Sequence, residues 1–331
     1  MTRVEWVPLS ERARWRSALE GIEHGFLQEP EYSAAAAGVT GHEPGLWTWR
    51  DEHGKAVCPV ARRPAPGGGF DLVTPLGFGG FATAGSLAGM TAGWSEFWRD
   101  EGALAAYVQM SPWQGPDLWR TSLEGFGDAL RPSRECWLWD LRPQPADLAA
   151  GMHPNHRRWL QKWKDTACFD ADELKPAFDR LYADFLRRSN VGSAYHFTPT
   201  ALAELGASPG ALWIGGRDEA GGIEAVAIFL WNGRYADLFL SAATQPGRRQ
   251  SRALYWQAAQ RLREHGVHWL NLGGGVADGD PLSQFKKRFG ARPCRTLALR
   301  QVLDADGFRR ACDVAGVPAA SATVFPPWRA A

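Results

Sequence analysis

The sequence predicts a mixed α/β (α+β) fold built from two similar domains in tandem. The first sign is an internal similarity between the passage "GLWTWRDEHGKAVCPVARRP", which begins at residue 45, and "ALWIGGRDEAGGIEAVAIFLWNG", which begins at residue 211. Both read as an aromatic strand, an Asp-Glu-x-Gly turn and an apolar strand, and Trp47 matches Trp213. Similarity with a period of half the chain indicates a duplicated domain, not a short solenoid repeat.

The second sign is that segments with helical periodicity surround each of these passages. A third strand follows each passage, through Asp71 in the first copy and Asp237 in the second, and leads into a glycine loop. We therefore expect each domain to contain a central, largely antiparallel sheet flanked by helices. In the second copy we expect helices at about 154–166, 172–189, 198–205 and 249–265, and strands at 266–272 and 292–302.

Composition indicates an ordinary globular protein. The chain has 331 residues, 45% of them hydrophobic and 22% charged, and its apolar runs are too short to span a bilayer. The first residues lack the apolar core of a signal peptide, so we expect a cytoplasmic protein. The five cysteines are scattered and show no CxxC spacing, which favours reduced thiols over disulfides or a metal site.

Charge is distributed unevenly along the chain. Residues 1–150 contain 13 Lys and Arg against 19 Asp and Glu, whereas residues 151–331 contain 24 against 17. An acidic half joined to a basic half suggests that the basic half meets an anionic partner, although a drift of surface charge would give the same counts.

The most informative stretch is "NLGGGVADGDPLSQFKKRFGA", with three glycines after an apolar strand and three cations on a short helix. Asp280 precedes a proline, the arrangement of a side-chain cap followed by proline at the first helical position. Leu282, Phe285 and Phe289 fall on one apolar face. Lys286 lies on the flank nearest that face, and it is therefore the cation expected to enter a cleft.

Four motifs together resemble those of the Fem-type (FemXAB-like) peptidyltransferases, which consist of two tandem domains of the GNAT N-acyltransferase fold. They are "TPLGFGG", "HRRWLQKWK", "SAYHFTPTAL" and the glycine-then-FKxxFG block just described, and they occur in the family's order over nearly the whole chain. No long charged insertion is present, as in the compact family members. In those members the C-terminal tail returns to the first domain. The resemblance thus implies a first, acceptor-side domain of residues 1–145 plus 305–331 and a second, donor-side domain of residues 146–304.

The resemblance also implies formation of an amide bond. Fem-type enzymes transfer an aminoacyl group from aminoacyl-tRNA to an amine, with the donor channel in the second domain. A Phe-Lys pair at the start of the FKxxFG helix serves the tRNA 3′ end and the reacting ester, which in this chain selects Phe285 and Lys286. We expect Lys286 to stabilise the oxyanion, helped by backbone N–H groups at Gly273, Gly274 and Gly275. The alternative is a solvated surface cation beside a permissive turn.

The loop "TQPGRRQSRAL" indicates which acyl donor, acyl-CoA or aminoacyl-tRNA, the enzyme would use. Acyl-CoA-dependent GNAT enzymes carry Q/R-x-x-G-x-G/A at this place, and here Arg249 and Ser251 stand nearest the two glycine positions. That departure weakens the acyl-CoA interpretation. The helix "HRRWLQKWK" carries Trp159 and Trp163, which we expect to be core residues more than base-stacking platforms. The cations expected to meet tRNA phosphates are Arg248, Arg249, Arg252, Arg157, Arg158 and Lys287.

The acceptor is expected between the two domains, where the "PLGFGG" loop would let the backbone approach it closely and an early helix lines the cleft. Cell-wall enzymes of the family tend to carry a lysine on that helix for sugar-nucleotide phosphates, where this chain has Ala34–Ala37. We therefore expect a small amine, for instance in a specialised-metabolite pathway, in place of a peptidoglycan precursor. Asp71 and Asp237 are candidate general bases only by their positions at strand ends beside glycine loops. The candidate acceptor-binding residues are Gln28, Tyr32, Asp71, Gly77, Phe78, Gly79, Arg188, Tyr195 and His196.

The favoured interpretation is an aminoacyl-tRNA-dependent aminoacyltransferase that is monomeric and needs no cofactor beyond its co-substrate. The alternatives are an acyl-CoA-dependent N-acyltransferase of the same fold and an interpeptide aminoacyltransferase acting on a peptidoglycan precursor. A non-catalytic RNA-binding module would also retain the fold and the basic second half.

Overall fold

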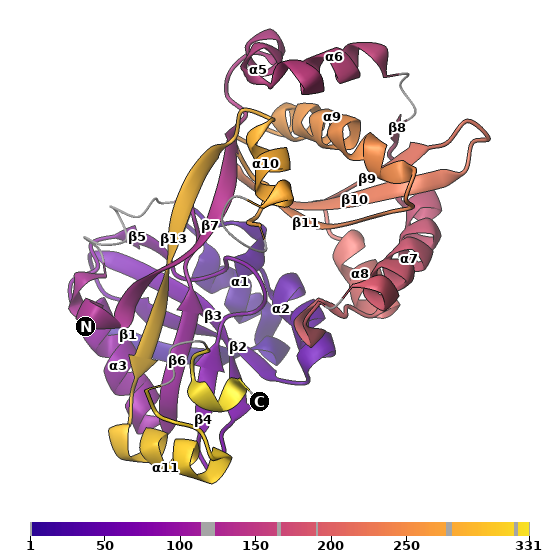
Figure 1. The fold of residues 1–331 in the computed structure, drawn as a ribbon. Helices are drawn as coiled ribbons and strands as arrows, with labels where there is room; N and C mark the ends of the chain where they lie inside the picture. The colour runs from indigo at the N-terminus through magenta and orange to yellow at the C-terminus, as the bar shows by residue number, and fades with distance from the viewer. Residues whose placement is uncertain are drawn as a thin grey trace. The chain divides into compact units, whose positions relative to one another are not determined.

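The computed structural model of the chain describes residues 2–113, 123–163, 167–189, 191–275, 280–320 and 324–330. Contacts divide the chain into two compact units (Figure 1). Unit 1 consists of Met1–Arg134 and Arg295–Ala331, and unit 2 consists of Glu135–Cys294. These boundaries lie earlier in the chain than the expected 145/146 and 304/305, because strands β7 (Leu130–Asp140) and β13 (Arg292–Val302) each contribute residues to both units.

Unit 1 contains the sheet order β1-β2-β3-β4-β6-β13, with β5 paired to β3. The predicted meander is present, since β2 pairs antiparallel with β3 and β3 pairs antiparallel with β4. β4 then pairs in parallel with β6. The bounds are β1 Arg3–Pro8, β2 Glu43–Arg50, β3 Gly54–Pro64, β4 Phe70–Val73, β5 Ala82–Gly85 and β6 Ala103–Gln109.

The helices of unit 1 cover a core that is rich in tryptophan. Trp47 from β2 and Trp94 from α3 meet edge to face with ring centroids 5.0 Å apart, and both are completely buried. Many of the chain's tryptophans therefore serve hydrophobic packing in this unit. The helices are α1 (Arg12–Leu19), α2 (Pro30–Thr40), α3 (Met90–Asp100) and α11 (Ala305–Ala315), with short 3-10 turns η1 (Leu9–Glu11), η2 (Phe26–Gln28), η3 (Glu124–Ala129) and η6 (Pro327–Arg329).

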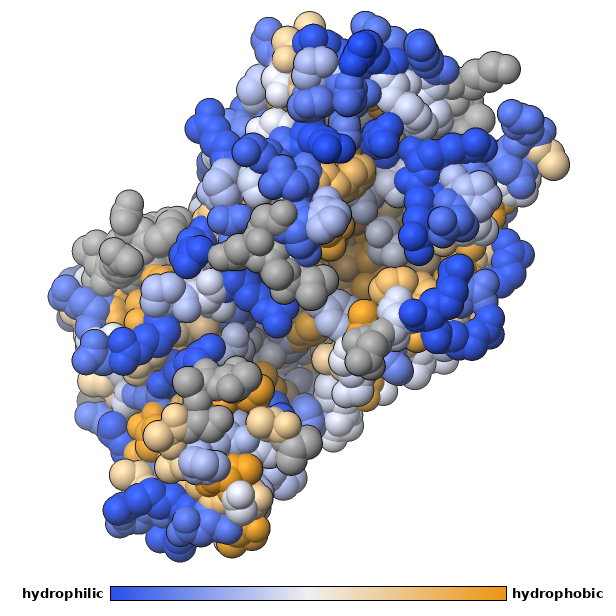
Figure 2. Space-filling view, in the orientation of Figure 1, coloured by the Kyte–Doolittle hydropathy of each residue, from blue (hydrophilic) through white to orange (hydrophobic). Residues whose placement is uncertain are grey.

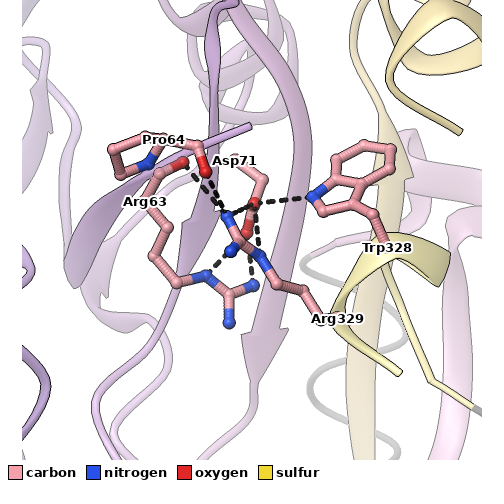
Figure 3. A network of polar contacts seen from close by, with 5 residues as sticks. All are labelled: Arg63, Pro64, Asp71, Trp328 and Arg329. Carbon is pink, nitrogen blue, oxygen red and sulfur yellow. Dashed lines mark hydrogen bonds and ion pairs between the residues drawn. The ribbon is translucent and has the colours of Figure 1, made fainter. Parts of the chain in front are cut away.

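The C-terminal tail is attached to unit 1 through a buried ionic network (Figure 3). Asp71 of β4 is fully buried and accepts hydrogen bonds from Arg63 of β3 and, at 2.6 Å, from Arg329 of η6. The indole N–H of Trp328 donates to the same carboxylate at 3.1 Å. Two cations and an indole saturate this carboxylate, which explains how it is tolerated in the core.

Unit 2 repeats the strand order of unit 1 as β8-β9-β10-β11-β12-β7. The three strands of the predicted second meander pair antiparallel in turn, and β11 pairs in parallel with β12, as β4 does with β6. In both units the last strand comes from the other half of the chain, β13 in unit 1 and β7 in unit 2. The bounds are β8 Ala167–Cys168, β9 Ala211–Arg217, β10 Ile223–Asn232, β11 Tyr235–Ala243 and β12 Trp269–Asn271.

The helices of unit 2 begin close to the expected residues because their caps are local. Asp170 caps α7 by accepting a hydrogen bond from the backbone N–H of Asp172, and Thr198 caps α8 in the same manner. In Figure 1, α6 lies along α9, which covers β9 and β10. The helices are α5 (Pro145–Gly151), α6 (Pro154–Lys162), α7 (Ala171–Arg188), α8 (Pro199–Gly206), α9 (Ser251–Glu264) and α10 (Pro281–Lys287), with 3-10 turns η4 (Ser193–Tyr195) and η5 (Gly247–Gln250).

The predicted mixed α/β class is confirmed by this duplicated sheet with helices around it. Within the described ranges, none of the helices has both the length and the apolar character needed to cross a bilayer. All five cysteines are free thiols.

Candidate functional site

Helix α10 begins as the sequence predicts. The side chain of Asp280 accepts a hydrogen bond from the backbone N–H of Ser283 at 2.7 Å, and a proline occupies the first turn. Phe289, just beyond the helix, is completely buried and Phe285 is half-buried. The predicted inclusion of Leu282 in this apolar face is wrong, since Leu282 is 44% exposed.

Lys286 of α10 is only 5% exposed, whereas Lys287 next to it is exposed. Its ammonium nitrogen donates a hydrogen bond to the carbonyl oxygen of Gly274 at 2.5 Å. Burial lowers the pKa of Lys286 to about 8, and this effect is only partly opposed by the negative charges of Asp280 and Cys136. A buried cation with a single backbone partner is a group that can exchange that partner for a ligand oxygen.

The glycine stretch before α10, residues 273–275, lies against the ammonium group of Lys286. Gly274 approaches the carbonyl oxygen of Glu135 so closely that a Cβ atom there would lie 2.5 Å from it, which excludes any larger residue. The backbone N–H of Gly273 donates to the side chain of Asn271 at 2.8 Å, so its predicted availability to an oxyanion is wrong. Across the described parts of the chain, the N–H groups of Gly274 and Gly275 have no hydrogen-bond acceptor. These two remain the candidate donors.

Two buried polar pairs lie close to Lys286 in unit 2. Asp237 of β11 accepts a hydrogen bond from the side-chain amide of Asn271 at 2.9 Å, and burial raises the pKa of Asp237 to about 7. Cys136 of β7 and Cys294 of β13 share a thiol–thiol hydrogen bond that raises the pKa of Cys136 and lowers that of Cys294. The charges of Lys286 and Asp237 both act on Cys136, so these groups form one electrostatic neighbourhood.

Phe285 packs against a cluster of aromatic rings. Its ring lies 5.5 Å from that of His156 on α6 and 5.8 Å from that of Tyr255 on α9. His156 is 1% exposed, and neither ring nitrogen has a hydrogen-bond partner among the residues that the structure describes. Burial and the positive charges of Arg252 and Arg288 lower the pKa of His156 to about 4, so the ring is neutral at pH 7.

The cations expected at the donor gather on α6, on η5 and at the start of α9. Arg252 lies over the ring of Trp159, 5.6 Å from its centroid, and also acts on His156. Trp159 stacks on Trp163, and both are half-exposed, so the expectation that they are core residues is wrong. Trp159 lies on α6, one turn after the buried His156, and Trp163 follows the helix as its C-cap residue. Figure 2 shows hydrophilic residues over α5 and α6.

The other predicted donor cations make few contacts. Arg158 donates to the side chain of Asn155, and Arg157 donates to a carbonyl oxygen at the end of α5. Arg248 and Arg249 are exposed on η5, and the guanidinium of Arg249 lies 3.8 Å from the carboxylate of Glu224. The exposed guanidinium of Arg248 is thus accessible to an anion from solvent, whereas that of Arg249 already has Glu224 as an ion-pair partner.

The backbone of η5 is closed to a pyrophosphate. The N–H of Gly247 donates to the hydroxyl of Thr244 at 3.0 Å, and the N–H of Arg248 donates to the carbonyl of Thr244 at 3.1 Å. The N–H of Arg249 donates to Pro246 at 3.4 Å. A phosphate-binding loop needs such N–H groups unpaired, and here the loop itself uses them.

The acceptor candidates of unit 1 come together, with their polar groups directed into the protein. The amide of Gln28 donates to the carbonyl oxygen of Gly79, and the hydroxyl of Tyr32 donates to that of Leu76. Both side chains are 1% exposed. Gln28 and Tyr32 therefore brace the loop that contains Gly77, Phe78 and Gly79, in which Phe78 is half-buried.

Asp71 is unsuited to the base role considered for it. Its two carboxylate oxygens are occupied by Arg63, Trp328 and Arg329, and the side chain has no exposed surface. This arrangement holds the aspartate as an anion inside the fold and leaves it no route to a substrate proton.

The acceptor candidates of unit 2 lie at the end of α7 and beyond it. Arg188 is exposed and donates to the carbonyl oxygen of Asp184. Tyr195 is 36% exposed, with its carbonyl oxygen held by the hydroxyl of Tyr182, and His196 is exposed. Their side chains are thus available to a ligand.

Sequence reasoning missed the buried polar residues around Lys286. His156 and Asn271 begin two of the quoted motifs, and Cys136 and Cys294 lie outside them. None of the four was assigned a role, because their proximity arises only when β7, β11, β12, β13, α6 and α10 pack. The one available signal was a titratable or amide residue within an apolar strand, such as Asn271 in "HWLNLGGG". Among the described residues, no group of three or more His, Cys, Asp or Glu side chains is placed to hold a metal ion.

No family model matches the sequence, and no curated protein matches it. Solved structures do match its fold. The crystal structure of FemX aligns with a TM-score of 0.70 over 93% of this chain and 99% of its own, at 12% sequence identity.

Two further structures show the same fold at low identity. L-PGS from Bacillus licheniformis has a TM-score of 0.55 and 16% identity, over 87% of this chain and 91% of its own. The C-terminal DUF2156 domain of a protein described as a lysylphosphatidylglycerol synthetase, from Agrobacterium fabrum, has a TM-score of 0.54 and 18% identity, over 96% and 98%. The predicted tandem GNAT-like, Fem-like fold is confirmed by these similarities.

Proposed function

We propose that this protein is an acyltransferase that moves an aminoacyl group from aminoacyl-tRNA to the amine of a small acceptor, with Lys286 as the oxyanion-stabilising residue. The observation that carries the proposal is the burial of Lys286 against the glycine stretch, with its ammonium group on the carbonyl oxygen of Gly274. The fold shared with FemX and the Phe285-Lys286 pair on α10 support the same reaction.

The reaction needs a donor for the oxygen that becomes negative. The acceptor nitrogen attacks the ester carbonyl carbon, a C–N bond forms, and the ester C–O bond breaks to release the tRNA ribose hydroxyl. The proton lost by the amine is transferred to that leaving oxygen, directly or through water. The carbonyl oxygen carries negative charge in between, and a positioned ammonium group with nearby N–H groups stabilises it.

The pKa of Lys286 suits this role. At about 8, it leaves most of the Lys286 side chains protonated at pH 7, so that Nζ can donate. Replacing the carbonyl oxygen of Gly274 by a developing oxyanion gives the buried cation a charged partner in a site of low polarity, where such an interaction is strong. Stabilisation therefore increases as the transition state is approached.

The choice of donor rests on unit 2. Arg157, Arg158 and Arg252 with the half-exposed Trp159–Trp163 pair form a basic, partly aromatic surface suited to a nucleic acid backbone and a terminal base. The closed η5 loop argues against acyl-CoA, because Gly247, Arg248 and Arg249 already use their N–H groups. The short acceptor helix α2 carries Ala34–Ala37 and no cation there, which favours a small amine over a sugar nucleotide.

The test is side-by-side binding of purified protein to aminoacylated tRNA and to acetyl-CoA, each at two salt concentrations. Micromolar tRNA binding that weakens steeply with salt, with no acetyl-CoA binding, is the expected result. Acetyl-CoA binding without tRNA binding would overturn the donor assignment. Binding of tRNA with no transfer to any of a panel of amines would favour the RNA-binding module.

A further inference from the structure

The glycine stretch that holds Lys286 is itself held by two buried polar side chains. Asn271, at the end of β12, accepts the N–H of Gly273 on its side-chain oxygen at 2.8 Å. Its amide nitrogen donates to a carboxylate oxygen of Asp237, on β11, at 2.9 Å. Both side chains are buried, Asn271 almost completely. A continuous chain of contacts thus runs from Asp237 through Asn271 and the backbone of Gly273 and Gly274 to Lys286.

Each link of this chain is short and directional. Gly273 has φ of +74°, a left-handed conformation open to glycine, and a Cβ atom there would lie 3.3 Å from the Lys286 ammonium nitrogen. The N–H of Gly273 belongs to the Leu272–Gly273 peptide, and the carbonyl of Gly274 belongs to the Gly274–Gly275 peptide. The carbonyl oxygen of the peptide between them, that of Gly273, accepts the backbone N–H of Trp137 at 3.1 Å. The hydrogen bonds to Asn271 and from Trp137 therefore hold the two peptides that lead to the Gly274 carbonyl.

The duplicated unit offers an internal comparison. Asp71 of β4 and Asp237 of β11 occupy corresponding strands, each the third of its meander and each paired in parallel with the next strand. Asp71 is neutralised by Arg63 and Arg329. Within the described ranges, Asp237 has one hydrogen-bond donor, the neutral amide of Asn271, although a carboxylate can accept several.

Burying a carboxylate with a single neutral donor is costly for folding. Burial raises the pKa of Asp237 to about 7, because removal from water destabilises the charged form of the carboxylate. An aliphatic side chain at position 237 would pack there without this cost to folding. Groups retained at such cost are concentrated where they orient reacting side chains.

We propose that Asp237 and Asn271 are positioning residues for Lys286, which fix the glycine stretch at the N–H of Gly273 so that the carbonyl oxygen of Gly274 holds the ammonium group in place. The proposal rests on the role of Lys286 given above, and it assigns a task to two residues that do not themselves touch the substrate. Asn271 acts directly on the glycine backbone, and Asp237 acts by holding the amide of Asn271 in the one orientation that presents its oxygen to Gly273.

The test measures Lys286 itself in the ligand-free protein. The pH dependence of the labelling rate of its amine by an acylating reagent, read by mass spectrometry, gives its pKa, expected near 8 in the wild type. Asn271→Ala and Asp237→Ala should release the glycine peptide, admit water to the amine and move the midpoint upward towards the ordinary lysine value. Asp237→Asn keeps an acceptor for Asn271 and should leave the midpoint within a few tenths of a pH unit.

A control separates positioning from loss of stability. Asp170→Ala removes the cap of α7 in the same unit and should lower stability while leaving the Lys286 midpoint unchanged. If Asn271→Ala does not fold, Asn271→Ser is the smaller change, with the same upward shift expected. An unchanged midpoint in the folded Asn271 and Asp237→Ala variants would overturn the proposal.

This outcome is distinguishable from failure of the proposed function. The labelling experiment contains no tRNA, CoA or acceptor, so a shifted midpoint establishes the positioning even if the protein does not bind aminoacyl-tRNA. Where transfer is measurable, Asn271→Ala should lower kcat about tenfold or more with little change in the donor KM, because the ground-state donor contacts remain. A change confined to KM would contradict a positioning role.

Discussion

The ammonium nitrogen of Lys286 and the carbonyl oxygen of Gly274 lie 2.5 Å apart, so that one buried cation rests on the backbone of a glycine turn. Twelve positions separate the two residues in the chain, and the cap of α10 by Asp280 lies between them. The ligand-free protein thereby keeps the cation at the place where the proposed oxyanion forms, with an uncharged partner that a substrate can displace.

Replacing Lys286 by methionine tests the cation itself. Methionine has similar bulk and no charge, so the fold should be retained while transfer falls on the order of 100- to 1,000-fold. The affinity for aminoacyl-tRNA should change little, since Arg157, Arg158 and Arg252 remain. The measurement is single-turnover transfer alongside equilibrium tRNA binding. Unchanged turnover would remove Lys286 from the mechanism.

The pKa of Lys286 predicts a pH dependence. The protonated amine donates the hydrogen bond, and its pKa of about 8 means that this form is lost as the pH rises through 8. The rate of transfer should therefore show a descending limb with a midpoint near pH 8, after correction for spontaneous hydrolysis of the ester. The limb should be absent from the residual rate of Lys286→Met.

Gly274→Ala tests the close approach of the glycine stretch to β7. A Cβ atom would lie 2.5 Å from the carbonyl oxygen of Glu135, so the strand must move and take the Gly274 carbonyl with it. We expect a loss of stability of about 1–3 kcal/mol and a larger loss of transfer. Gly38→Ala on α2 is the matched control, because a Cβ atom there meets nothing within 4 Å. It should be neutral or stabilising in urea denaturation.

Asp71→Ala tests the anchoring of the tail. The substitution leaves Arg63 and Arg329 as partly buried cations without their partner, and the expected cost is about 3–5 kcal/mol in the free energy of unfolding. Limited proteolysis followed by mass spectrometry should also release the tail sooner. Asp306→Ala removes an exposed ion pair with Arg309 and should cost less than about 1 kcal/mol. Equal effects of the two variants would refute the anchoring role.

His156→Phe tests the buried, unpartnered imidazole beneath Phe285. The folded-state pKa of about 4 lies below the unfolded value near 6.5, so the unfolded chain binds more protons between these limits. The wild type should therefore lose stability as the pH falls from 6.5 towards 4. The variant should lose less over this window, and at pH 7 it should be as stable as the wild type or up to about 2 kcal/mol more stable. Urea titrations at pH 7, 6, 5 and 4.5 provide the comparison.

Local patterns determined where the elements of this chain lie. The two meanders, with Trp47 and Trp213 on matching strands, were predicted because alternation and turn residues act over a few positions. The start of α10 was predicted because Asp280 bonds to the N–H of Ser283 only three residues later. The burial of Lys286 agrees with its place beside the Phe289 face.

Only the tertiary structure decided which polar groups meet. Asp71 and Asp237 look alike in the sequence, as strand aspartates ahead of glycine loops, yet Asp71 binds Arg329 from 258 positions away and Asp237 binds Asn271. Trp159 and Trp163 were expected in the core and lie half-exposed, although they follow the buried His156 by three and seven positions. Periodicity specifies which face of an element is apolar, whereas the partner of a buried charge depends on strand pairing and helix packing between distant segments. The chemistry around Lys286 therefore emerges only when unit 2 is assembled.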